Sequence, residues 1–371
     1  MGTPLEDAPI LFRHVRDIAV SPPEGVKPWK ARELVRLIEE SGFDSDDKHV
    51  LYWKFGQRLV YLLDSPTDDR LVLLRKLFGH NLRAESRILS DTDQRDHLLH
   101  VSQVFLTGWL ILHRCRLFSN PPPEWKPYNW SAEGLFQKLN ECWLITSLLH
   151  DCGYSVEFAG ASNRHEVLVK STFGDIYDRA SVGAVNAPNL AQHARNIWNL
   201  RASLIGLAAA PLDEPSIKKK HEIQLSIPDH ALSSSKTVLD TSSTLHLPED
   251  IYKIASISIA CHNFQYNVDS FSSSDTPQNR WFSLSFEKEP LAALLHLCDE
   301  IQDWSRERDD EPLARATGSR PRAFQATYLT DISFPDPDQM TVQVQRRREL
   351  YPEDRPIAME TRMRLLQERK L

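Results

Sequence analysis

Four segments of the sequence place residues of metal-binding type inside otherwise apolar stretches. They are HLLHV at 97–101, LLHDCGY at 148–154, ACHN at 260–263 and LLHLCDE at 294–300. A buried carboxylate, such as that of Asp151 or Asp299, is costly unless it is paired or bound to a cation. Imidazoles together with carboxylates suit manganese, iron, cobalt, nickel or zinc. A single histidine on an apolar helix is most often a satisfied core residue, but four such coincidences favour a site for a divalent transition metal.

The adjacent residues His150 and Asp151 are the centre of this prediction. Neighbouring side chains inside a helix point about 100° apart and would not normally share an ion. At the end of a helix, both side chains can turn toward one ion. The sequence predicts a helix over about 132–150, with Ser131 as its N-cap and Gly153 as its stop. We therefore expect the pair at the C-terminal end of this helix.

Three of these segments resemble the motifs of the HD superfamily of metal-dependent phosphohydrolases. LLHDCGY is similar to the central motif, HLLHVSQVF at 97–105 to the first, and PLAALLHLCDEIQDW at 290–304 to the last. The resemblance covers about residues 93–306. It implies that His100, His150, Asp151 and Asp299 bind one metal ion.

Binuclear members of that superfamily carry further histidines between the central motif and the last Asp. His262 resembles one of these, as an additional metal ligand or as a substrate-binding residue. The segment 177–184 (YDRASVGA) resembles the pattern that supplies another, but Arg179 stands where the histidine would be. Arg179 therefore favours one ion over two, and its guanidinium could instead clamp a phosphate. His165 or His193 could substitute for the missing ligand, although neither stands in a matching context.

The resemblance implies hydrolysis of a phosphate ester by a metal-activated water, as in a phosphomonoesterase or phosphodiesterase. The implied substrate is a nucleotide, a cyclic nucleotide or a similar small phosphorylated molecule. Asp151 would orient the nucleophile, Arg179 would bind phosphate, and His97 would donate a proton or contact phosphate. Two alternatives stay open: a degenerate HD domain that binds a nucleotide or protein without turnover, and a di-iron oxygenase on the same fold. The oxygenase needs two metals, so Arg179 counts against it.

The composition of the chain argues against several classes of function. The 371 residues carry a formal net charge of −7, which argues against general nucleic-acid binding. The longest apolar stretches fall short of the roughly 20 residues that span a bilayer, and the N-terminus does not resemble a signal peptide. We therefore expect a cytoplasmic protein without a membrane partner. Self-association as a homo-oligomer is left open by the sequence.

The predicted fold is predominantly all-α. A helical N-terminal segment, 1–92, contains helices at 29–40, 49–63 and 68–89. The HD domain, 93–306, is a helical bundle with helices at 93–118, 132–150, 176–210, 249–262 and 290–306 and a polar surface insertion at 211–248. The C-terminal region, 307–371, is expected to form a small β-hairpin from 324–334 and 340–346, followed by a terminal helix at 357–370.

Overall fold

The fold is that of a computed structural model and is predominantly helical. The residues it describes are 10–23, 27–41, 48–63, 97–115, 118, 127–131, 134–153, 187–205, 230–243, 245–262, 284, 286–303, 327–336, 339–346 and 358–364. The predicted helix at 68–89 lies outside these residues. None of the described helices is long and apolar enough to cross a membrane.

The chain divides into two compact units. Unit 1 comprises Met1–Asp64, Leu89–Glu124 and Leu297–Leu371, and unit 2 comprises Ser65–Ile88 and Trp125–His296. The division falls within helix α15 (Pro290–Asp303), so that this helix gives His296 to unit 2 and Asp299 to unit 1.

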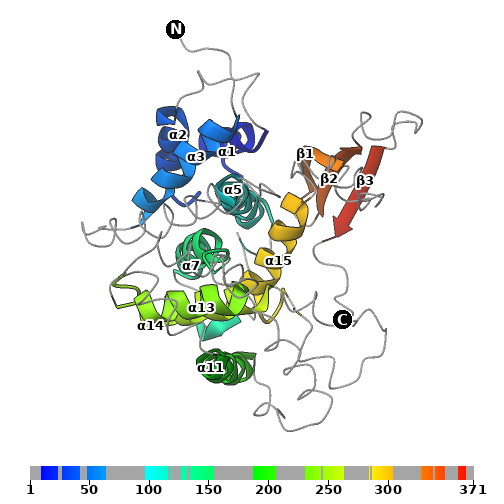
Figure 1. The fold of residues 1–371 in the computed structure, drawn as a ribbon. Helices are drawn as coiled ribbons and strands as arrows, with labels where there is room; N and C mark the ends of the chain where they lie inside the picture. The colour runs from blue at the N-terminus through cyan, green and yellow to red at the C-terminus, as the bar shows by residue number, and fades with distance from the viewer. Residues whose placement is uncertain are drawn as a thin grey trace, which may run out of the picture. The chain divides into compact units, whose positions relative to one another are not determined.

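Besides the end of α15, unit 1 contains four whole α-helices among its described residues (Figure 1). They are α1 (Ile10–Val20), α2 (Ala31–Glu40), α3 (Lys48–Leu59), which continues into a short 3-10 helix η2 (Val60–Leu62), and α5 (His97–Arg114). The predicted helix at 93–118 corresponds to α5, and residues 104–107 and 109–112 of this helix are completely inaccessible. Helices α1 and α3 pack against α5.

The beginning of α2 is fixed to α5 through the backbone of Trp29. The N–H of Trp29 donates to Nε2 of His113 at 2.9 Å, and its carbonyl accepts from the indole N–H of Trp109 at 3.2 Å. The Nδ1–H of His113 donates to the carbonyl of Trp109, so the neutral imidazole has both nitrogens satisfied. Burial lowers the pKa of His113 to about 3, which keeps the ring neutral at ordinary pH.

Unit 1 also contains an antiparallel sheet in the order β1-β2-β3. Its strands are β1 (Thr327–Asp336), β2 (Gln339–Arg346) and β3 (Ala358–Arg364). Thr327 is opposite Arg346, and Val342 is opposite Thr361. The expected terminal helix at 357–370 is therefore wrong at 358–364. Met359, Thr361 and Met363 alternate with charged residues, a period of two that fits a strand, and pairing with β2 decides between strand and helix.

Unit 2 contains helices α7 (Leu135–Leu149), α11 (Ala187–Ile205), α13 (His230–Thr241), α14 (Glu249–Cys261) and the first part of α15. A 3-10 turn, η3 (Pro127–Asn129), precedes α7. Helix α14 packs against α7 and α13, while α11 contacts α13 and α14. The expected N-cap of α7 was wrong: the helix begins after Gly134, whose φ of 76° is readily adopted by glycine, and not after Ser131.

The predicted surface insertion at 211–248 requires a larger correction. Residues 230–241 form α13, and its serines Ser233, Ser234 and Ser235 are buried. The Ser235 hydroxyl donates to the carbonyl of Ser256 on α14 at 2.8 Å, so the polar group is satisfied inside the unit. Small hydroxylated side chains thus allow close helix packing where the polar sequence suggested a solvent-exposed loop. Residues 206–229 lie outside the described residues.

Candidate metal centre

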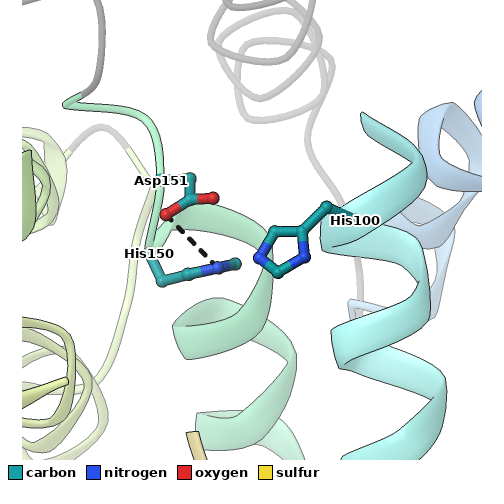
Figure 2. A group of neighbouring side chains, drawn as sticks. All are labelled: His100, His150 and Asp151. Atoms are coloured by element: carbon teal, nitrogen blue, oxygen red, sulfur yellow. Dashed lines mark ion pairs between the residues drawn. The ribbon is translucent and has the colours of Figure 1, made fainter. Parts of the chain in front are cut away.

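Helix α7 ends at the pair His150-Asp151, as the sequence predicted. His150 is the C-cap residue, with helical φ and ψ of −61° and −32°, and Asp151 follows in the turn. Nδ1 of His150 donates to the carbonyl of Ser147 at 2.7 Å. This bond places the ring proton on Nδ1 and leaves the Nε2 lone pair directed elsewhere. Nε2 lies 3.3 Å from Oδ1 of Asp151, and Figure 2 shows the ring beside this carboxylate.

Helix α14 ends in the same manner. His262 is its C-cap residue, with φ of −67° and ψ of −26°, and its Nδ1 donates to the carbonyl of Ile259 three residues earlier. Its Nε2 lies 3.9 Å from Oδ1 of Asp151. The rings of His150 and His262 have centroids 5.5 Å apart and meet nearly edge to face. Helices α7 and α14 therefore each end in a buried histidine. Its Nδ1 donates to a carbonyl of its own helix, and its Nε2 faces Asp151.

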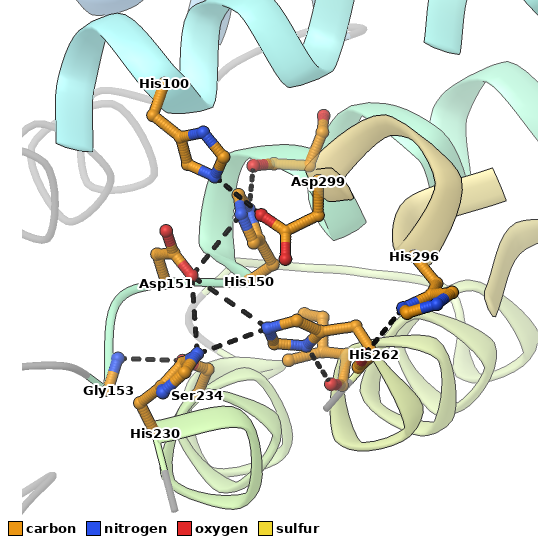
Figure 3. A network of polar contacts seen from close by, with 11 residues as sticks. His100, His150, Asp151, Gly153, His230, Ser234, His262, His296 and Asp299 are labelled. Carbon is orange, nitrogen blue, oxygen red and sulfur yellow. Dashed lines mark hydrogen bonds and ion pairs between the residues drawn. The ribbon is translucent and has the colours of Figure 1, made fainter. Parts of the chain in front are cut away.

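The third histidine near Asp151 is His230, the first residue of α13. Its Nε2 lies 3.7 Å from Oδ1 of Asp151 and 3.3 Å from Nε2 of His262 (Figure 3). His230 was not singled out from the sequence, because it lies in the segment interpreted as a polar insertion. The signal that could have found it is the spacing of Leu232 and Leu239, seven residues apart, which is typical of one helix face.

The distances among these atoms fit a bound cation. Asp151 Oδ1 and the Nε2 atoms of His230 and His262 form a triangle with edges of 3.3, 3.7 and 3.9 Å. The circle through these three atoms has a radius of about 2.1 Å, which matches the ~2.0–2.2 Å bonds of zinc to histidine nitrogen and carboxylate oxygen. Asp151, His230 and His262 are all buried, and their ligand atoms group as those of a metal site do. The donor set, imidazole nitrogen with carboxylate oxygen, suits a divalent transition metal.

Gly153 sets the distance between this turn and α13. A Cβ added to Gly153 would lie 2.3 Å from the backbone oxygen of His230 and 2.7 Å from the backbone nitrogen of Ser234. The N–H of Gly153 donates to Oγ of Ser234 at 2.7 Å. Gly153 is not among the positive-φ residues of the described ranges. Glycine is therefore needed here for the close approach of the first turn of α13, in addition to following the end of α7 as the sequence predicted.

In unit 1, two of the predicted ligands form a pair of their own. Nε2 of His100 lies 2.8 Å from Oδ1 of Asp299, and both side chains are largely buried, with exposures of 1% and 12%. His100 comes from α5 and Asp299 from the last turns of α15. A buried imidazole and carboxylate at this distance form a charge-assisted contact, and both groups belong to the donor types that bind transition metals.

The structure describes the remaining predicted residues only in part. His97 begins α5, but its side chain lies outside the described residues, as do Arg179 and His165 altogether. His193 is described, and its Nε2 contacts Oγ of Ser235 at 3.2 Å. Burial, followed by the charge of Lys236, lowers the pKa of His193 to about 4. His193 thus joins α11 to α13 and does not take part in the cluster around Asp151.

Comparison with known proteins adds no relative. No family model, no curated protein and no solved structure matches the chain. The likeness to the HD superfamily therefore rests on the motifs themselves. The structure shows a mainly helical chain with a buried cluster of His and Asp side chains that could hold a metal ion.

Proposed function

We propose that this protein is a metal-dependent phosphohydrolase of the HD type, with Asp151 as the central ligand of its metal centre. The observation that carries the proposal is the convergence of three imidazole Nε2 atoms, from His150, His230 and His262, on Oδ1 of this one buried carboxylate. The motif resemblance adds His100 and Asp299 as ligands, and their buried pair in unit 1 supplies the expected donor types.

The contacts within the cluster are compatible with a bound cation. The proton of His262 is on Nδ1, so its Nε2 presents a lone pair to Nε2 of His230 at 3.3 Å. Either a hydrogen bond from Nε2–H of His230 or a shared cation can join these two nitrogens. Burial of a carboxylate such as that of Asp151 is costly unless it is paired or bound to a cation, and a divalent cation would supply positive charge.

The reaction assigned to the site is attack of water on a phosphate ester. When bound, a divalent ion supplies Lewis acidity and lowers the pKa of a coordinated water. Asp151 would accept a hydrogen bond from the attacking water and orient it. His97 would donate a proton to the leaving oxygen or contact phosphate, and the guanidinium of Arg179 would bind phosphate oxygens in a fork. A nucleotide, cyclic nucleotide or similar small phosphate ester is the proposed substrate class.

His230 bears on the question whether the site holds one metal ion or two. The inference of a single ion depended on Arg179, which replaces the histidine that one motif would supply. His230 provides an imidazole from a different segment, close to both Asp151 and His262. This contact removes the argument from Arg179 against two ions, and with it the main argument against a di-iron oxygenase.

The test is metal analysis of the purified protein, followed by a phosphomonoesterase and phosphodiesterase screen with added Mn²⁺. Asp151→Asn should lose bound metal and lower turnover at least about 100-fold, because it removes the shared ligand. Asp250→Asn is the matched control, since Asp250 pairs with Lys138 at the partly exposed start of α14. Absence of both metal and turnover in the wild type would refute the proposal and favour a binding module. Two irons with a charge-transfer absorption would instead favour an oxygenase.

A further inference from the structure

His296 contacts the metal centre without belonging to the ligand set. It lies on α15 within unit 2, and its ring is half-buried. Its Nδ1 lies 3.1 Å from the backbone carbonyl oxygen of His262 (Figure 3). A carbonyl oxygen only accepts hydrogen bonds, so Nδ1 of His296 must carry the ring proton.

The carbonyl that His296 binds belongs to the C-cap residue of α14. The last carbonyls of a helix have no partner within the helix, and donors from elsewhere satisfy them. The ring of His262 is already held by the carbonyl of Ile259 on its own helix. The two bonds together fix His262 at its ring and at its backbone, which leaves Nε2 one direction, toward Asp151 and His230.

Helix α15, which carries His296, is held at its start by a buried ion pair. Glu289, the residue before α15, receives two hydrogen bonds from the guanidinium of Arg201 on α11, one of them 2.7 Å long. Both side chains of this pair are buried, with exposures of 0% and 3%. The backbone carbonyl of Glu289 also accepts from the N–H of Ala293 at 3.0 Å, inside the first turn. A buried bidentate pair of this type holds the start of α15 in one geometry.

We propose that His296 is a positioning residue, which sets the direction of Nε2 of His262 by donating a hydrogen bond to the His262 carbonyl. Through this bond, α15 controls the affinity of the metal centre without supplying a ligand from this position. The inference depends on the proposed metal site and extends it by His296, which lies in the segment 290–304 but is not one of the ligands that the resemblance implies.

The experiment compares two variants of the full chain by Co²⁺ titration and by the visible d–d spectrum of the Co²⁺ complex. His296→Leu removes the donor and keeps an apolar side chain of similar reach. His296→Asn places an amide N–H where Nδ1 stands, because both nitrogens are bonded to Cγ. We expect His296→Leu to bind Co²⁺ about tenfold more weakly with a shifted spectrum, and His296→Asn to retain the wild-type affinity and spectrum.

Three outcomes would overturn the inference. Wild-type affinity and spectrum in His296→Leu would show that the bond does not act on the metal, even if the thermal midpoint falls. An equal loss in both variants would show that the donor is not what matters. Should the leucine variant fail to fold, the ring tautomer of wild-type His296, read from nitrogen NMR at pH 8, decides: a proton on Nε2 is incompatible with the bond. Failure of the wild type to bind Co²⁺ would instead refute the proposed function, and the metal role of His296 with it.

Discussion

Replacement of Gly153 by alanine tests how α13 is placed against the turn that carries Asp151. The new Cβ would lie 2.3 Å from the backbone oxygen of His230 and 2.8 Å from Cβ of Ser233. Non-bonded carbon and oxygen atoms rarely approach within about 3 Å, so the first turn of α13 must move by on the order of 1 Å. The obstructing atoms are mostly backbone, and no rotation of a flexible side chain can relieve the overlap.

Two measurable consequences follow. Overpacking of this kind costs about 1–3 kcal/mol, which urea unfolding of the metal-free protein measures. The same movement displaces Nε2 of His230 from Asp151 by a distance comparable with half of a metal–nitrogen bond. We therefore expect Gly153→Ala to lower the affinity for Co²⁺ or Zn²⁺ at least about tenfold.

Gly134→Ala is the matched control, because the two glycines flank the two ends of α7. An added Cβ at Gly134 meets no atom within 4 Å, but the φ of 76° is unfavourable for alanine. This variant should lose about 1 kcal/mol of stability and keep its metal affinity. If Gly153→Ala binds metal as the wild type does and is destabilised no more than the control, the packing argument is refuted.

Three further predictions concern buried groups. His230→Ala should lower Co²⁺ affinity at least about tenfold in calorimetric titration, whereas His193→Leu should leave it unchanged. The stability that His113 contributes is present above pH 6.5, the pKa of an unfolded histidine, and is lost as the pH falls toward its folded pKa of about 3. Urea unfolding gives the difference in free energy of unfolding between the wild type and His113→Gln. This difference should be roughly 2 kcal/mol smaller at pH 5 than at pH 8. Arg201→Met should cost about 3–5 kcal/mol because it leaves Glu289 buried and unpaired, and a second substitution, Glu289→Leu, should restore most of that loss in thermal unfolding.

The sequence predicted the helices whose apolar residues recur at helical spacing. The buried character of α5 and the ends of α7 and α14 follow from runs of Leu, Ile, Val and Trp bounded by breaks in the pattern. Helix α13 was missed because its buried face is made of Ser233, Ser234 and Ser235, whose burial depends on partners such as the carbonyl of Ser256 on α14. Tertiary hydrogen bonds of this kind are not visible in a local pattern. The strand β3 was missed for a related reason. Its sequence is compatible with a helix or a strand, and pairing with β2 decides for the strand.

The same distinction explains which ligands the sequence could identify. His150 and His262 each stand at a helix end, where Nδ1 donates to the carbonyl three residues earlier. Each of these ligands is therefore oriented by a carbonyl only three residues away in the sequence, at Ser147 and at Ile259. His230 begins its helix, and the residues directly before it lie outside those that the structure describes. The position of the His230 ring depends on the close packing of α13 against Gly153, which is 77 residues earlier in the sequence. Only folding brings this ring next to Asp151.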